Sequence, residues 1–75
     1  MLIQVDAYRT IELPESDKWK YYVVQSELTS NEVKIVSKHR TRNAAIDAAK
    51  RTAGIQVHVI DDGVAIPRAA FYVWG

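Results

Sequence analysis

The chain contains no cysteine among its 75 residues, and its only histidines, His39 and His58, lie far apart. Disulfide bonds and thiolate-based zinc sites are therefore excluded, and we expect no structural zinc site. A domain this small that lacks such cross-links must be held together by its own packing or by association with a second copy.

Long apolar runs are also missing, since none approaches the roughly 18–20 residues that span a bilayer. Residues 1–6 lack the charged start and apolar stretch of a signal peptide. We therefore expect a cytoplasmic protein with no membrane partner. Hydrophobic residues make up 48% of the chain, which argues against disorder. We expect a single small domain over residues 1–75.

Only three glycines are present, and none lies in a phosphate-binding loop. Metal-ligand clusters and a supported Ser/His/Asp set are absent from the sequence too, so we expect no enzyme activity, no catalytic residue and no cofactor. Asp61 and Asp62 precede Gly63, a sequence typical of a tight turn. His58 alternates with buried-type valines, which predicts a histidine that faces solvent or an interface.

Alternating apolar and polar residues predict strands over 3–13, 19–28, 33–38 and 55–60. Arg9 interrupts the first pattern, so a bulge or strand end is expected near Tyr8 and Arg9. The second and third segments flank a turn and should form an antiparallel hairpin. Residues 64–66 can form a short strand, which Pro67 confines to an edge.

One helix is predicted over residues 42–53, with Thr41 as its N-cap and Gly54 as its C-cap. Its expected apolar stripe consists of Ala45, Ile46, Ala49 and Ala53, and Asp47 can pair with Arg51. The sequence therefore predicts an α+β fold in the order β-β-β-α-β-β. It has a mainly antiparallel sheet of four to five strands and one helix across one face.

Residues 20–66 also carry a recurring pattern of hairpin, threonine, alanine-rich helix and strand before an aspartate-glycine turn. Its matching residues are Tyr22-Val23-Val24, Thr41, Ala44-Ala45-Ile46-Asp47-Ala48-Ala49-Lys50, Val57-His58-Val59-Ile60 and Asp62-Gly63. This pattern resembles a family of small uncharacterised bacterial β-β-α-β domains. It is also similar to the N-terminal domain of HicB-type antitoxins, which resembles double-stranded-RNA-binding domains in topology. The resemblance implies the fold rather than an activity.

Positive charge is concentrated in residues 33–51, which hold six cations and one anion. The start of the predicted helix lies in this stretch, and unpaired N–H groups there favour an anion. The candidate anion-binding or nucleic-acid-binding residues are Lys34, Lys38, His39, Arg40 and Arg42. The alternative is a solvated basic surface, which such clusters commonly form.

Aromatic residues suggest two further surfaces. Trp19, Tyr21 and Tyr22 would stack on bases if exposed on the sheet, or fill the core between sheet and helix. The tail residues Phe71, Tyr72, Val73 and Trp74 are apolar on both faces of an expected strand. Because successive side chains of a strand point to opposite faces, half of this set needs another surface. We therefore predict a self-association or partner-binding edge in the tail.

These features favour a small non-enzymatic interaction module that binds a second copy of itself, as a homodimer, or another protein. The alternative is a nucleic-acid-binding domain that uses the basic cluster, although the net charge of +1 favours this less. A third hypothesis is an inhibitor of a host protein, of the kind that phages and mobile elements encode.

Overall fold

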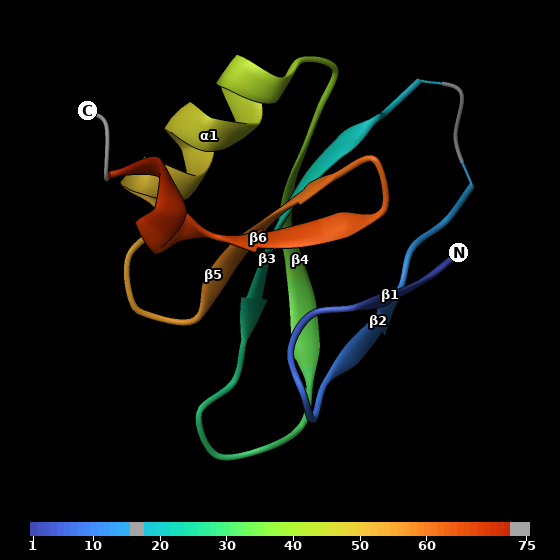
Figure 1. Cartoon of the computed structure of the whole chain (residues 1–75), viewed down its shortest axis with the longest axis vertical. Helices are drawn as coiled ribbons and strands as arrows, with labels where there is room; N and C mark the ends of the chain where they lie inside the picture. The colour runs from blue at the N-terminus through green and yellow to red at the C-terminus, as the bar shows by residue number, and fades with distance from the viewer. Residues whose placement is uncertain (16–17, 73–75) are drawn as a thin grey trace.

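The computed structural model describes residues 1–15 and 18–72, and it confirms the predicted α+β fold class (Figure 1). The described elements are β1 (Leu2–Gln4), β2 (Thr10–Glu12), β3 (Tyr21–Ser26), β4 (Val33–His39), α1 (Arg42–Arg51), β5 (Val57–Asp61), β6 (Val64–Pro67) and a 3₁₀-helix, η1 (Arg68–Phe71). Strands β3 to β6 form an antiparallel sheet in the order β4-β3-β5-β6, and β1 pairs with β2.

The N-terminal segment forms a hairpin, so the prediction of one strand over residues 3–13 was wrong. Strands β1 and β2 pair with Ile3 opposite Ile11. Between them the Asp6 carboxylate accepts hydrogen bonds from the Tyr8 N–H and the Arg9 guanidinium, each 2.8 Å long. These bonds hold the pKa of Asp6 below its ordinary value, the Tyr8 bond most strongly. At the place where a bulge or strand end was expected, an aspartate turn separates the two strands, and β2 begins directly after Arg9.

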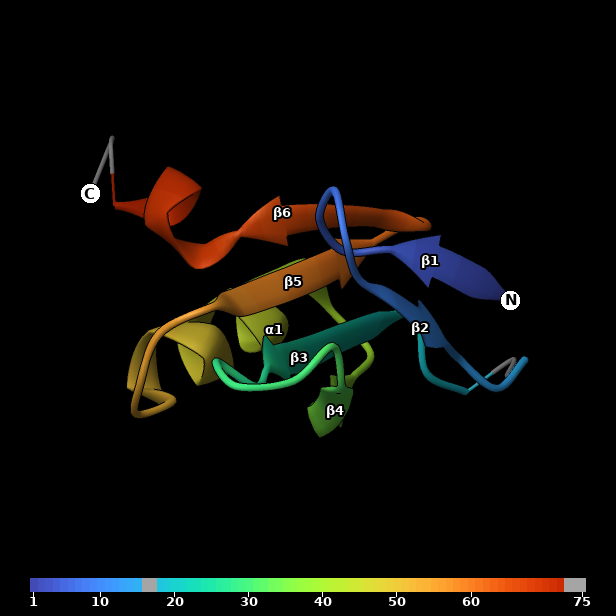
Figure 2. The same ribbon diagram turned by 90° about the horizontal axis from the view of Figure 1, so that it is seen from below.

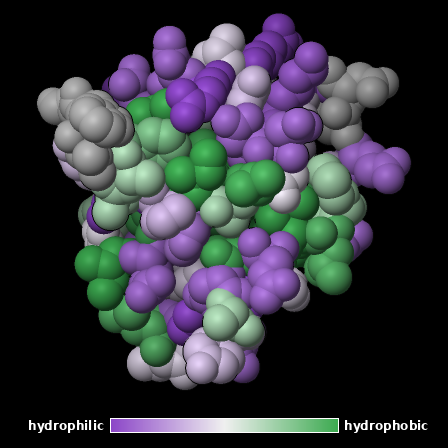
Figure 3. All heavy atoms as spheres, in the orientation of Figure 1, coloured by the Kyte–Doolittle hydropathy of each residue, from purple (hydrophilic) through white to green (hydrophobic). Residues whose placement is uncertain are grey.

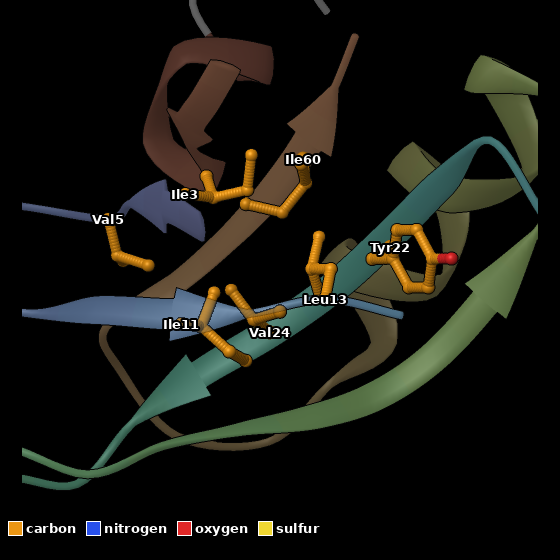
Figure 4. Packing of buried hydrophobic residues seen from close by; sticks show 7 residues of the cluster. All are labelled: Ile3, Val5, Ile11, Leu13, Tyr22, Val24 and Ile60. Carbon is orange, nitrogen blue, oxygen red and sulfur yellow. The ribbon is translucent and has the colours of Figure 1, made fainter. Parts of the chain in front are cut away.

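The sheet is covered on both faces, by the hairpin on one side and by α1 on the other (Figure 2). The hairpin-side core consists of Ile3, Val5, Ile11, Leu13, Tyr22, Val24 and Ile60 (Figure 4). The helix-side core consists of Val23, Ala45, Ala49, Val57 and Val59. The chain is thus a three-layer structure in which the central strands β3 and β5 are buried on both faces.

This second covering layer changes the environment of β5. All four residues from Val57 to Ile60 are buried, and His58 is only 7% exposed. The prediction that His58 faces solvent was therefore wrong, because the hairpin lies over its face of the sheet. Ile55, which the predicted strand over residues 55–60 included, precedes β5 and is exposed.

A bulge at Val36 redirects the side chains of β4. Val24 pairs with Ile35 while the preceding Val23 pairs with Ser37, so Val36 is skipped. Val33 and Ile35 consequently pack on the hairpin-side core, whereas Ser37 shares the helix-covered face with Val23. In a regular strand Val33, Ile35 and Ser37 would share one face.

Helix α1 begins where predicted, and the Thr41 hydroxyl accepts a hydrogen bond from the Ala44 N–H. It ends at Arg51, two residues before the predicted end, and Thr52 is its extended C-cap. Gly54 has the expected positive φ of 95° but lies beyond that cap.

The buried stripe of α1 consists of Ala45 and Ala49, with Ala48 packed beside them. Ile46 is half-buried and Ala53 exposed, so that part of the predicted stripe was wrong. Small side chains let the helix backbone approach the sheet closely. Arg51 donates to the Asp47 carbonyl rather than pairing with its carboxylate.

The turn between β5 and β6 and the edge strand after it agree with what their own residues favour. Asp62 and Gly63 both have positive φ, and they form the two-residue turn between β5 and β6. Strand β6 lies at the sheet edge, as predicted, and extends to Pro67, one residue beyond the predicted strand. The chain then forms η1 instead of an extended tail. Within the described residues, no helix combines the length and apolar character needed to cross a bilayer.

Candidate functional site

Two of the predicted anion-binding residues are already paired with carboxylates. Arg42 Nε lies 2.9 Å from Asp61 Oδ2, which anchors the start of α1 to the end of β5. Lys34 Nζ lies 3.9 Å from Glu27 Oε1, near the opposite end of β4. The five predicted residues therefore do not form one continuous basic patch.

His39 is half-buried on the helix-covered side, where its Nε2 lies 2.7 Å from Ser37 Oγ. Burial lowers the pKa of His39, and the positive charge of Arg51 lowers it further. The neutral imidazole is therefore favoured at pH 7, and His39 adds no cation to an anion site.

Other cations gather around Trp19. Lys18 Nζ lies 5.0 Å from the centroid of the Trp19 ring, and Arg40 Cζ lies 5.6 Å from it. The Lys20 N–H donates to the His39 carbonyl, and Lys38 is the cross-strand neighbour of Tyr22. The basic corner, as we name it, consists of Lys18, Lys20, Lys38 and Arg40.

Sequence reasoning found only half of this corner, Lys38 and Arg40, and missed Lys18 and Lys20. The missing signal was the register of the β3–β4 hairpin. Pairing of Tyr21 with His39 brings the Lys18-Trp19-Lys20 segment next to Arg40. A predicted hairpin register would have identified the corner without further structure.

The basic corner borders a cleft of about 730 Å³. Three separate segments build this Trp19 cleft: the end of the hairpin, the start of β3 and the β5–β6 turn. The lining residues are Met1, Leu13, Pro14, Glu15, Trp19, Lys20, Tyr21, Tyr22, Ile60, Asp61, Asp62 and Gly63. It therefore combines an apolar and aromatic surface with charges of both signs.

Three aromatic residues lie at or just before the start of β3, and their environments differ. They are Trp19, Tyr21 and Tyr22. Tyr22 is buried in the hairpin-side core, and Tyr21 packs against the helix-side core. Trp19 packs against the hairpin-side core and is half-buried. The core interpretation is thus confirmed for Tyr22, and covered sheet faces leave no open platform for bases.

The predicted tail interface is rearranged in the described residues. Phe71 packs against the helix-side core with Arg42 over its ring. Tyr72 is 52% exposed, and Lys50 lies over its ring. Val73 and Trp74 lie outside the described residues, and the strand expected for this tail was wrong for residues 70–72.

Exposed apolar residues are scattered over the surface. In the view of Figure 3 they form separate patches among polar side chains rather than one continuous face. The large ones are Met1, Leu2, Tyr8, Leu28, Val36, Ile55, Val64 and Tyr72. This distribution leaves the Trp19 cleft as the concave surface with the richest chemistry among the described residues.

The acidic residues of the β5–β6 turn are structural. Asp61 binds Arg42, and Asp62 adopts the left-handed conformation that the turn requires. Over residues 1–15 and 18–72, no group of three or more histidine, cysteine, aspartate or glutamate side chains could hold a metal ion.

A buried polar group lies under the hairpin turn. His58 Nδ1, Ser26 Oγ and Arg9 Nε are buried without a hydrogen-bond partner among the described residues. Burial lowers the pKa of His58, while the Asp6 carboxylate and the backbone of Gln56 act in the opposite direction. The native state therefore favours a neutral His58.

Acidification is expected to destabilise the fold through His58. Because the unfolded chain binds this proton more readily, the free energy of unfolding should fall as the pH drops below the ordinary value of 6.5. Urea midpoints at neutral and mildly acidic pH measure the effect, which should shrink in His58→Gln. His39→Gln measures the share of the second histidine. An acid response of His58→Gln equal to that of the unchanged protein would contradict this assignment.

No family model, curated protein sequence or solved structure matches the chain. The resemblance to small bacterial β-β-α-β domains and to HicB-type antitoxins therefore stays a prediction.

Proposed function

We propose that this chain is a small non-enzymatic binding module that contacts a protein partner through the Trp19 cleft. The observation that supports this proposal best is a half-buried tryptophan beside an arginine at the rim of a cleft of about 730 Å³. Tryptophan, tyrosine and arginine dominate the energetics of protein interfaces, particularly around concave sites.

The core holds the aromatic side chains of the cleft in place before a partner binds. Trp19 packs against the hairpin-side core, and Tyr22 belongs to that core. Fixed aromatic side chains lose little conformational entropy when a partner binds. A protein segment that inserts an apolar side chain would therefore gain contact area at small cost.

A different protein fits this surface better than a second copy. A two-fold dimer whose axis passes through the basic corner would bring the cations of two copies together, and like charges oppose such a contact. Self-association through Tyr72 and the residues after it remains a separate proposal, which sedimentation of the protein at high concentration tests directly.

Nucleic-acid binding is the second candidate, and the four cations of the basic corner favour it. The surrounding charge is less suitable, because Glu15 and Asp62 line the same cleft. Phosphate binding scales with the number of phosphates neutralised, and Arg42 and Lys34 are already ion-paired.

Selection of displayed random peptides on the immobilised protein tests the proposal. We expect enriched peptides that bind the unchanged protein and Trp19→Phe but bind Trp19→Ala much more weakly. Since Trp19 also contributes to packing, Arg40→Gln provides a second variant at the rim, and circular dichroism verifies folding. Tyr8→Ala serves as the control, because Tyr8 is 84% exposed and lies outside the cleft.

Two results would overturn the proposal. One is a selection that enriches no peptide. The other is a set of peptides that bind Trp19→Ala and Arg40→Gln as well as they bind the unchanged protein.

A further inference from the structure

We infer that the Trp19 cleft recognises an acidic peptide segment that carries an apolar side chain. The apolar side chain occupies the cleft, and the carboxylates beside it contact the basic corner. This inference rests on the proposed function and adds the chemistry of the partner.

Ion pairing distinguishes some cations of the described residues from others. Among the described residues, no carboxylate lies within ion-pair distance of Lys20, Lys38 or Arg40. By contrast, Arg9, Lys34 and Arg42 each have a carboxylate partner. Lys20, Lys38 and Arg40 therefore lie together without such partners at one corner of the molecule, where an anionic ligand would neutralise them.

Arg40 is positioned beside the cleft by its contact with Trp19. The planar guanidinium of Arg40 lies over the Trp19 ring, 5.6 Å from its centroid. This cation–π contact restricts the arginine side chain and uses none of its N–H groups in a hydrogen bond to a carboxylate. Arg40 can then bind a carboxylate with two parallel hydrogen bonds.

Hairpin pairing adds Lys20 and Lys38 to the same edge. The Lys20 backbone bonds to His39, next to Arg40, and Lys38 lies opposite Tyr22 in the ladder. Directly opposed residues in antiparallel strands have Cβ atoms about 5 Å apart. Tyr22 lines the cleft, so the Lys38 side chain originates beside it. A short acidic segment along this edge meets several cations.

The cleft offers a site for the apolar side chain of the ligand. Leu13, Tyr22 and Ile60 contribute to the cleft and also belong to the hairpin-side core (Figure 4). A volume of about 730 Å³ lies within the usual range of ligand sites, about 300–1,000 Å³. Since Leu13, Tyr22 and Ile60 are already buried, an inserted leucine or phenylalanine would cover apolar surface of the half-buried Trp19 and of Met1, which is 55% exposed.

The acidic residues of the cleft argue for a peptide rather than a nucleic acid. Glu15 and Asp62 line the cleft, while Asp61 is engaged by Arg42. A phosphodiester chain carries charge at every step and would be repelled by these carboxylates. A peptide can carry carboxylates at only some positions and present backbone N–H donors to Glu15 and Asp62 at others.

The peptides enriched on the immobilised protein provide the first test. We expect them to be rich in aspartate and glutamate around one large apolar residue. A short synthetic peptide with one phenylalanine flanked by glutamates should then bind in fluorescence anisotropy. Its glutamine counterpart should bind about tenfold more weakly, and added salt should weaken the acidic peptide selectively.

Charge reversal of the rim tests the residues. Arg40→Glu and Lys20→Glu are each expected to weaken the acidic peptide about tenfold. Lys50→Glu makes the same change in net charge on an exposed part of α1, where Lys50 contacts Tyr72, and should leave binding unchanged. Arg40→Lys should retain part of the affinity, since lysine keeps the charge without the planar contact.

The possible failures are distinct. Enriched peptides that need Trp19 but carry no excess of acidic residues would overturn this inference and leave the proposed function intact. Oligothymidylate that displaces the acidic peptide and binds more tightly at the same salt concentration would also overturn it, in favour of nucleic acid. An equal loss of affinity in Lys50→Glu and Arg40→Glu would show that net charge, not the corner, attracts the peptide.

Discussion

Replacing Leu13 by alanine is expected to lower the free energy of unfolding by about 3 kcal/mol. Leu13 is 1% exposed and joins the hairpin to the sheet in the hairpin-side core. A chain of 75 residues has a total stability of about 4–11 kcal/mol. Loss of this one side chain therefore removes a large share of it. Urea denaturation measures the change.

Leu2→Ala is the matched control, because Leu2 belongs to the same hairpin but is 65% exposed. Its effect should stay within about 0.5 kcal/mol. Equal effects of the two substitutions would mean that the hairpin does not pack on the sheet. Amide exchange gives a second measurement, since a loosened hairpin should expose the β3 and β5 backbone to faster exchange.

Replacing Arg68 by methionine is expected to cost about 2–3 kcal/mol. The Arg68 guanidinium donates hydrogen bonds to the carbonyls of Ala49 at 3.2 Å, Thr52 at 2.6 Å and Gly54 at 2.6 Å. The last carbonyls of a helix lack N–H partners from a following turn, so Arg68 supplies donors at this end. The carbonyls of Thr52 and Gly54 accept one bond each, and the Ala49 carbonyl accepts a second bond beside that from the Thr52 N–H. Methionine retains an apolar stem of similar length and removes only the donors. Chemical denaturation measures the loss of stability.

Arg51→Met provides the comparison for Arg68→Met. Arg51 is exposed and makes one long hydrogen bond, 3.4 Å, to the Asp47 carbonyl. Its effect should stay within about 0.5 kcal/mol. Faster amide exchange in the last turn of α1 should accompany Arg68→Met alone. If the two variants are equally stable, the cap inferred for Arg68 is wrong.

The two substitutions also separate stability from binding. Leu13 lines the Trp19 cleft, whereas Arg68 lies outside it. Under conditions where each variant is folded, Leu13→Ala should weaken binding of the acidic peptide and Arg68→Met should not. This contrast follows from the position of the cleft between the hairpin and the sheet.

Two of the four residues of the basic corner could be predicted from sequence. The difference depends on whether a residue joins the corner through its neighbours in the chain or through strand pairing. Lys38 and Arg40 were recognised because they belong to a dense run of cations. Lys18 and Lys20 join them only through strand pairing. The ion pair of Arg42 could not be predicted, since its partner Asp61 is distant in the chain and adjacent only in the fold.

Local chemistry in the amino-acid sequence determined the β3–β4 hairpin, the Thr41 cap, the Asp62-Gly63 turn and the edge position of β6. Each of these depends on neighbouring residues and on the φ values or hydrogen bonds that they favour. Only the tertiary structure decided that a hairpin covers the second face of the sheet, burying His58 and creating the Trp19 cleft. Packing between segments distant in the chain depends on their combined shapes, which no local pattern contains.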